Sequence, residues 1–139
     1  MAKKKTSDIP PPEAPKLYTT LGKSASAEYT EKKSVFIGYA SPVKTEREAL
    51  DFISAVRKKH SDARHNVFAY QLNGGGTARY SDDGEPQGTA GVPVLEVIKK
   101  SGADDCVVVV TRYFGGILLG ASGLVRAYSA AAKSAVDAA

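Results

Sequence analysis

Cysteines and long apolar runs are scarce in this chain, and each scarcity excludes a class of protein. The single cysteine, Cys106, excludes an internal disulfide and fits a reducing compartment. No run approaches the roughly 18 apolar residues that a transmembrane helix needs, so we expect no membrane contact. The first residues, MAKKKTSDIPPPEAPK, have no apolar core after their lysines and do not resemble a secretory signal. These absences together predict a cytoplasmic protein.

Net charge is also modest, and much of it lies at the N-terminus. The formal charge is +4 over 139 residues, and residues 1–16 carry four lysines against two acids, or +2. The remaining +2 is weak support for nucleic-acid binding by itself. The length fits one domain. We predict a disordered, basic and proline-rich tail at residues 1–16, followed by one folded domain at residues 17–139.

Periodicity predicts alternating strands and helices. A T-x-x-E capping box at Thr45 and Glu48 opens the first helix, and the basic residues at 58–60 suit its C-terminal end better than a nucleic-acid patch. Further helices are expected near Pro93 and over 122–136. Strands are expected at 17–30 (an edge strand), 34–43, 66–72, 78–80 and 106–111 (a central strand). This order predicts an α/β (α+β) two-layer sandwich, with a mixed sheet and its helices on one face.

The strongest functional signal is a strand–glycine–helix unit over residues 107–136. Ten of the 13 glycines lie between residues 75 and 123. A helix that begins near Ser122, after a glycine loop, presents unpaired N–H groups and favours an anion. The alternative is that the glycines only permit a tight turn and close packing. The spacing approaches a phosphate loop, but Ala121 replaces its lysine, which disfavours a nucleotide triphosphatase. The predicted ligand- or anion-binding residues are Arg112, Tyr113, Gly115, Gly116, Gly120, Ser122 and Arg126, where Tyr113 or Phe114 could stack on a base.

A second candidate element is the acidic turn SDDGEPQGTAG. Its acids, Asp82, Asp83 and Glu85, could bind Mg²⁺, do acid–base work, shape the turn, or pair with Arg112 or Arg79. We favour the turn and ion-pair roles. No zinc site and no catalytic triad can be assembled from the spacing, and we predict no metal and no cofactor. His65 opens a strand and is expected to orient a loop by hydrogen bonding.

These segments together resemble the IMPACT N-terminal family. The resemblance rests on EKKSVFIGYASPV, SDARHNVFAY, SDDGEPQGTAG and VVVVTRYFGGILLGASGLVRAYS, and runs from about Leu17 to Val136. It implies a fold like the second domain of a small-subunit ribosomal protein, and an association with translation. Eukaryotic relatives regulate a starvation-responsive kinase through a partner protein. We expect a short form without the C-terminal ferredoxin-like domain of bacterial relatives. Val35 and Val67 stand where the family often has a basic residue and a cysteine.

Three functions remain open at this point. The first is a translation-associated binding module that engages RNA, the ribosome or a translation factor through the glycine loop and arginines. The second is a small Mg²⁺-dependent enzyme acting on a phosphate ligand. The third is a pure protein-interaction domain. The residues favour the first.

Overall fold

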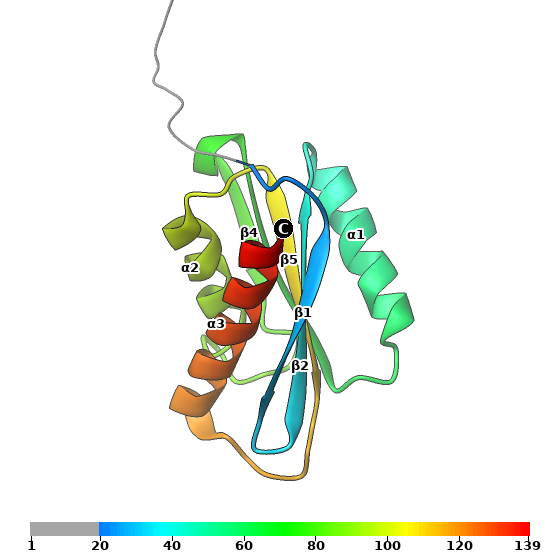
Figure 1. Cartoon of the computed structure of the whole chain (residues 1–139), viewed down its shortest axis with the longest axis vertical. Helices are drawn as coiled ribbons and strands as arrows, with labels where there is room; N and C mark the ends of the chain where they lie inside the picture. Colours follow the sequence, from blue (N-terminus) through cyan, green and yellow to red (C-terminus); the bar gives the residue numbers. More distant parts are fainter. Residues whose placement is uncertain (1–19) are drawn as a thin grey trace, which may run out of the picture.

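The sheet of the computed structural model has five strands in the order β1-β2-β5-β3-β4, and the structure describes residues 20–139 (Figure 1). The strands are β1 (Ala25–Glu31), β2 (Ser34–Pro42), β3 (His65–Leu72), β4 (Thr77–Ser81) and β5 (Cys106–Tyr113), with a short 3-10 turn, η2 (Asn73–Gly75), before β4. The predicted central strand is confirmed as β5, and the predicted edge strand as β1, which begins at Ala25 rather than at residue 17. The predicted tail at residues 1–16 lies outside the described residues.

The α/β class is confirmed, but the predicted mixed sheet is wrong because every neighbouring pair of strands is antiparallel. A helix separates β2 from β3, and such a crossover usually joins parallel strands. β2 and β3 do run in the same direction. However, β5 lies between them and is antiparallel to both, so no parallel pair is hydrogen-bonded.

The helices cover both faces of the sheet, which corrects the prediction that they lie on one face. The helices are α1 (Glu46–Lys59), α2 (Gly91–Ser101) and α3 (Gly120–Ala138). Val108 and Val110 of β5 pack in one core with α2 and α3, whereas Val107 and Val109 pack with α1. A central strand that is apolar on both faces must be covered on both. α1 provides that second cover (Figure 1).

Helix α3 packs very closely on the sheet, as its alanines predict. A Cβ built on Gly38 of β2 would lie 2.5 Å from the carbonyl oxygen of Ala131. Only glycine fits at this point, where the helix backbone approaches the strand. This close packing anchors the helix whose N-terminus follows the glycine loop.

The predicted start of α1 is also confirmed, with one change of partner. The hydroxyl of Thr45 accepts a hydrogen bond from the Glu48 amide at 3.1 Å, while the Glu48 carboxylate accepts from the Lys44 amide, not from that of Thr45. Within residues 20–139 no helix is both long and apolar enough to cross a membrane.

Candidate functional site

The acidic turn is built around Asp82, whose carboxylate organises the chain that follows it. One oxygen accepts hydrogen bonds from the amides of Gly91 (2.7 Å) and Ala90 (3.2 Å), and the other accepts from Gly88 (3.1 Å). These amides lie at and before the start of α2, where helical N–H groups lack partners. Asp82 therefore caps α2 from nine residues upstream.

Asp83 ties the same turn to β3 and α1. Its carboxylate accepts from the Asn66 amide at 2.6 Å and pairs with Arg57 at 3.1 Å. Its backbone carbonyl accepts from Nδ1 of His65 at 2.7 Å, so the predicted loop-orienting role of His65 is confirmed. Asp83 has a left-handed φ of 45°, a conformation that aspartate tolerates better than most residues. The turn is thus fixed by three elements rather than free to move.

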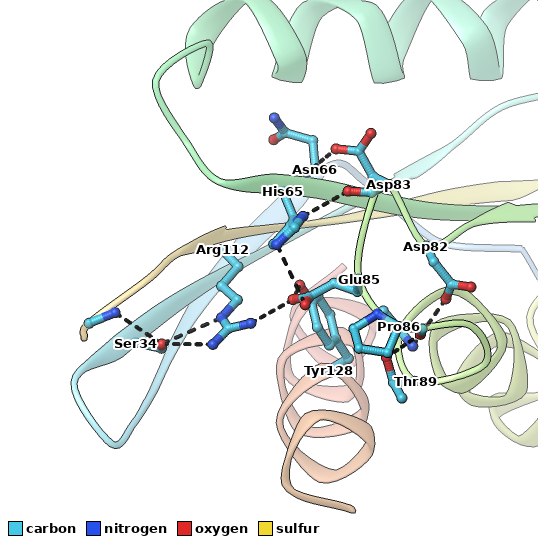
Figure 2. Close-up of polar contacts among 12 residues, drawn as sticks. Ser34, His65, Asn66, Asp82, Asp83, Glu85, Pro86, Thr89, Arg112 and Tyr128 are labelled. Atoms are coloured by element: carbon cyan, nitrogen blue, oxygen red, sulfur yellow. Dashed lines mark hydrogen bonds and ion pairs between the residues drawn. The ribbon is translucent and has the colours of Figure 1, made fainter. Parts of the chain in front are cut away.

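Glu85 is the centre of a buried polar cluster (Figure 2). One carboxylate oxygen accepts from Arg112 at 2.8 Å and from the Tyr128 hydroxyl at 2.5 Å. Burial, and then the bond to Glu85, raise the pKa of Tyr128. Of the two arginine partners that the sequence left open for these acids, Glu85 takes Arg112, whereas Arg79 lies beside Glu46. A buried ion pair with further hydrogen bonds gives the cluster one fixed geometry.

The guanidinium of Arg112 is buried among polar and aromatic partners. Arg112 is 5% exposed, and its guanidinium donates to the hydroxyl of Ser34 as well as to Glu85. It also lies over the rings of Phe36 and Phe114, at 5.5 and 5.4 Å from their centroids. The Ser34 hydroxyl accepts from the Gly115 amide at 3.2 Å. Ser34 therefore joins the first hairpin to the glycine loop.

Gly115 brings the glycine loop against the turn between β1 and β2. A Cβ at this position would lie 2.1 Å from the carbonyl carbon and oxygen of Lys33. The turn itself is a two-residue connection, because Glu31 pairs with Ser34, and both Lys32 (φ 48°) and Lys33 (φ 66°) are left-handed. Two positive φ values indicate a type I′ turn, which usually contains Asn-Gly. Here it presents two exposed lysines.

A cleft of about 280 Å³ opens beside this framework. Its floor includes His65, Glu85 and Arg112. Its walls are made by the acidic turn, the glycine loop and the first turn of α3, with Arg64, Pro86, Phe114 and Leu118. The guanidinium of Arg64 lies 4.8 Å from the centroid of the Phe114 ring. The two long glycine-rich motifs of the sequence therefore meet at one concave site, the usual place for a ligand.

The remaining predicted residues divide into those at the cleft and those away from it. Gly120 lines it, and Gly116 and Ser122 are exposed on either side of Gly120 in the chain. Arg126 instead pairs with Glu31 of β1 at 2.6 Å, and this carboxylate raises the pKa of the guanidinium.

The hydroxyl of Tyr113 lies in a different network, against Nδ1 of His60 (2.7 Å) and the carboxylate of Asp62 (3.0 Å). Nε2 of His60 faces the Tyr39 hydroxyl at 2.6 Å, and burial lowers the pKa of this imidazole. Tyr113 is therefore not placed to stack on a ligand in the cleft.

The acids do not form a metal centre of their own. Among residues 20–139 no three His, Cys, Asp or Glu side chains gather closely enough to hold a metal ion. The carboxylate oxygens of Asp82 and Asp83 accept from backbone amides and an arginine. One oxygen of Glu85, Oε2, accepts from both Arg112 and Tyr128. The ion-pair and turn roles therefore account for their contacts.

Three residues at this site had no role in the predicted set: Ser34, Arg64 and Leu118. The side chain of Leu118 is 81% exposed, and the sequence of the glycine loop does not indicate this exposure. The sequence signal that could have indicated Arg64 is its position next to His65.

We call Lys32, Lys33, Arg64 and residues 113–120 the glycine-loop end. Lys32, Lys33 and Arg64 form no ion pair with residues 20–139.

The fold and site define a small α/β domain with an antiparallel sheet, in which two glycine-rich loops enclose a cleft over a buried Glu–Arg pair. The Impact N-terminal domain model matches residues 32–136, and the chain belongs to that family. IMPACT family member YvyE of Bacillus subtilis is 50% identical over 112 residues, which are 80% of this chain and 52% of that protein. The chain thus spans about half the length of the curated relatives it matches.

Two solved structures share the fold. The crystal structure of a hypothetical protein matches with a TM-score of 0.83 and 36% identity, over 86% of this chain and 60% of that one. The two-domain translational regulator Yih1 matches with a TM-score of 0.50 and 26% identity, over 99% of this chain and 52% of that one. The predicted family is therefore confirmed.

Proposed function

We propose that this domain acts in translation by binding RNA, free or within the ribosome, through its glycine-loop end. The observation that carries the proposal is the gathering of Lys32, Lys33 and Arg64 around one exposed loop. Unpaired cations on a single surface attract the phosphate backbone. Yih1 is described as a translational regulator, and its likeness to this chain supports a role in the same process.

The surroundings of the three cations support this assignment. The β1–β2 hairpin and the loop that leads into α3 lie at the same end of the molecule, the lower end in Figure 1. The Arg64 amide donates to the Arg112 carbonyl at 3.1 Å, which brings the connection after α1 to that end as well. Three segments far apart in the sequence therefore present positive charge together.

The geometry suggests different roles for the two arginines first proposed to contact phosphate. The guanidinium of Arg112 is buried and bonded within the domain, so we assign it to holding the loops in place. Arg126 is paired with Glu31 but its side chain is 60% exposed, so it could exchange that partner for a phosphate. Arg64, whose guanidinium stacks on Phe114, takes the contact that the sequence gave to Arg112.

The test is fluorescence anisotropy with a labelled RNA hairpin at about 50 and about 200 mM salt. The variant Lys32→Asn/Lys33→Gly removes two charges from the glycine-loop end. The matched control, Lys99→Gln/Lys100→Gln, removes two exposed lysines at the C-terminal end of α2. We expect salt-dependent binding that the first variant weakens about tenfold and the control leaves nearly unchanged.

Two outcomes would overturn the proposal. One is no binding at about 10⁻⁴ M, the weak end of non-specific contacts. The other is equal loss of affinity in both double variants, which would place the RNA contact elsewhere or make it a response to net charge alone. The first outcome would leave a protein partner as the function to test.

A further inference from the structure

The floor of the cleft holds the imidazole of His65 beside the carboxylate of Glu85. Nδ1 of His65 lies 2.7 Å from the carbonyl oxygen of Asp83. A carbonyl can only accept, so Nδ1 carries the proton. In the neutral imidazole Nε2 is then an acceptor. This nitrogen is 3.5 Å from the carboxylate oxygen Oε1 of Glu85.

The two carboxylate oxygens of Glu85 differ in their hydrogen-bond partners. Oε2 already accepts from Arg112 and Tyr128, whereas Oε1 accepts no hydrogen bond from residues 20–139. The side chains of His65 and Glu85 lie next to each other (Figure 2). Both line the cleft, and they are 14% and 3% exposed. Within residues 20–139 no donor reaches Oε1 of Glu85 or, in the neutral imidazole, Nε2 of His65. A ligand that brings N–H groups to this point would satisfy both.

The walls of the cleft limit which donor fits. Two guanidinium groups, those of Arg64 and Arg112, outweigh the one carboxylate of Glu85, so a cationic ligand such as an ammonium group is disfavoured. Phe114 and Leu118 supply apolar surface. The volume of about 280 Å³ lies just below the range of typical small-molecule sites, which is roughly 300–1,000 Å³. A flat, uncharged group of modest size meets these conditions.

We propose that the cleft binds one unpaired nucleobase through its amino edge, with an N–H group directed at His65 Nε2 and Glu85 Oε1. Guanine, adenine and cytosine carry an exocyclic amino group, whereas the corresponding position of uracil is a carbonyl, a further acceptor. Arg64, which stacks on Phe114, offers a guanidinium plane to the base, a mode common in RNA recognition. This inference rests on the proposed RNA-binding function and names the nucleotides that the site selects.

The test is an NMR titration of the ¹⁵N-labelled domain with the monophosphates of guanosine, adenosine, cytidine and uridine, and with inorganic phosphate. We expect saturable shifts at the amides of Leu118 and Gly120 with the first three. Affinity for uridine monophosphate should be at least roughly tenfold weaker, because hydrogen bonds to a charged group are lost. The ring nitrogens of His65 should show a protonated Nδ1 and a free Nε2 before ligand is added.

Leu118→Ala removes apolar wall and should weaken the three amino-bearing nucleotides several-fold. Val125→Ala, an exposed apolar change on α3 outside the lining of the cleft, is the matched control. Glu85 is part of the buried framework, so the unmodified protein, not a Glu85 variant, decides the question. Three results would overturn the proposal: equal affinity for uridine monophosphate, the same shifts with phosphate alone, or a His65 ring protonated on both nitrogens in the free protein.

The failure of this proposal is distinct from failure of the RNA-binding function. RNA binding that depends on Lys32 and Lys33, without any preference among nucleotides, would reject the base pocket and keep the function. A nucleotide preference without RNA binding would keep the base pocket and reject the RNA-binding function.

Discussion

The lysine turn between β1 and β2 allows stability and binding to be changed in opposite directions. Lys32 and Lys33 both adopt left-handed backbone conformations, which cost an L-residue with a side chain roughly 1–2 kcal/mol each. Asparagine and glycine are the residues that a type I′ turn prefers. The variant Lys32→Asn/Lys33→Gly should therefore relieve most of this strain. The added glycine costs about 0.5–1 kcal/mol in chain entropy.

The expected net result is a gain of about 1–2 kcal/mol in the free energy of unfolding. For a domain of this size that corresponds to a rise in Tm of roughly 3–8 °C. The assay is urea unfolding followed by circular dichroism, with the two single variants measured separately. An unchanged or lower midpoint, with the turn shown intact by NMR, would refute the claim that the lysines are strained.

The same variant should bind RNA more weakly although it is more stable. Each lost phosphate contact lowers the slope of log affinity against log salt by about 0.7 for a single strand. Two lysines therefore account for a change of about 1.4. Strain is retained in proteins mainly where function uses it. A more stable variant with undiminished affinity would show that these lysines serve something other than RNA.

Three further predictions concern two residues of the framework under the site, Gly115 and Glu85, and Tyr70 in the core that packs against α1. Gly115→Ala should destabilise the domain by at least about 2 kcal/mol, since its Cβ would meet the Lys33 carbonyl; an unaltered urea midpoint would contradict this packing. Glu85→Gln should cost about 3–5 kcal/mol, because it leaves the Arg112 charge buried without its partner; a loss below about 1 kcal/mol would mean that the pair is dispensable. Burial raises the pKa of Tyr70 to about 12, so the folded state holds this proton more tightly than the unfolded state; stability should be complete below about pH 10 and fall as pH rises toward 12. Tyr70→Phe should remove part of that alkaline loss in melts at pH 8 and 11, and an identical loss in both proteins would argue against Tyr70 as its source.

Much of the fold was predictable because single strands and helices carry local signals. The valine run after Cys106 indicated a central strand, and its two apolar faces already implied cover on both sides. Strand order carried no such signal. The sequence does not show that β5 lies between β2 and β3, and the antiparallel sheet follows from that position alone.

The glycines and acids indicated segments that the fold brings together at the cleft, but spacing could not decide whether Arg112 or Arg79 pairs with Glu85. Asp82 caps a helix nine residues away, beyond the reach of short capping motifs. The turn at Lys32 escaped notice because two lysines do not resemble the Asn-Gly pair usual there. These contacts depend on tertiary structure, which no local pattern encodes.

The most direct test of the central claim is a chemical-shift map of the ¹⁵N-labelled domain with a short single-stranded RNA. Binding at the glycine-loop end predicts saturable shifts at Lys32, Lys33, Arg64 and residues 113–120, with η2 and residues 102–105 unaffected. These last segments lie at the opposite end of the sheet (Figure 1). Shifts centred on η2, or no shifts at millimolar RNA, would contradict the account.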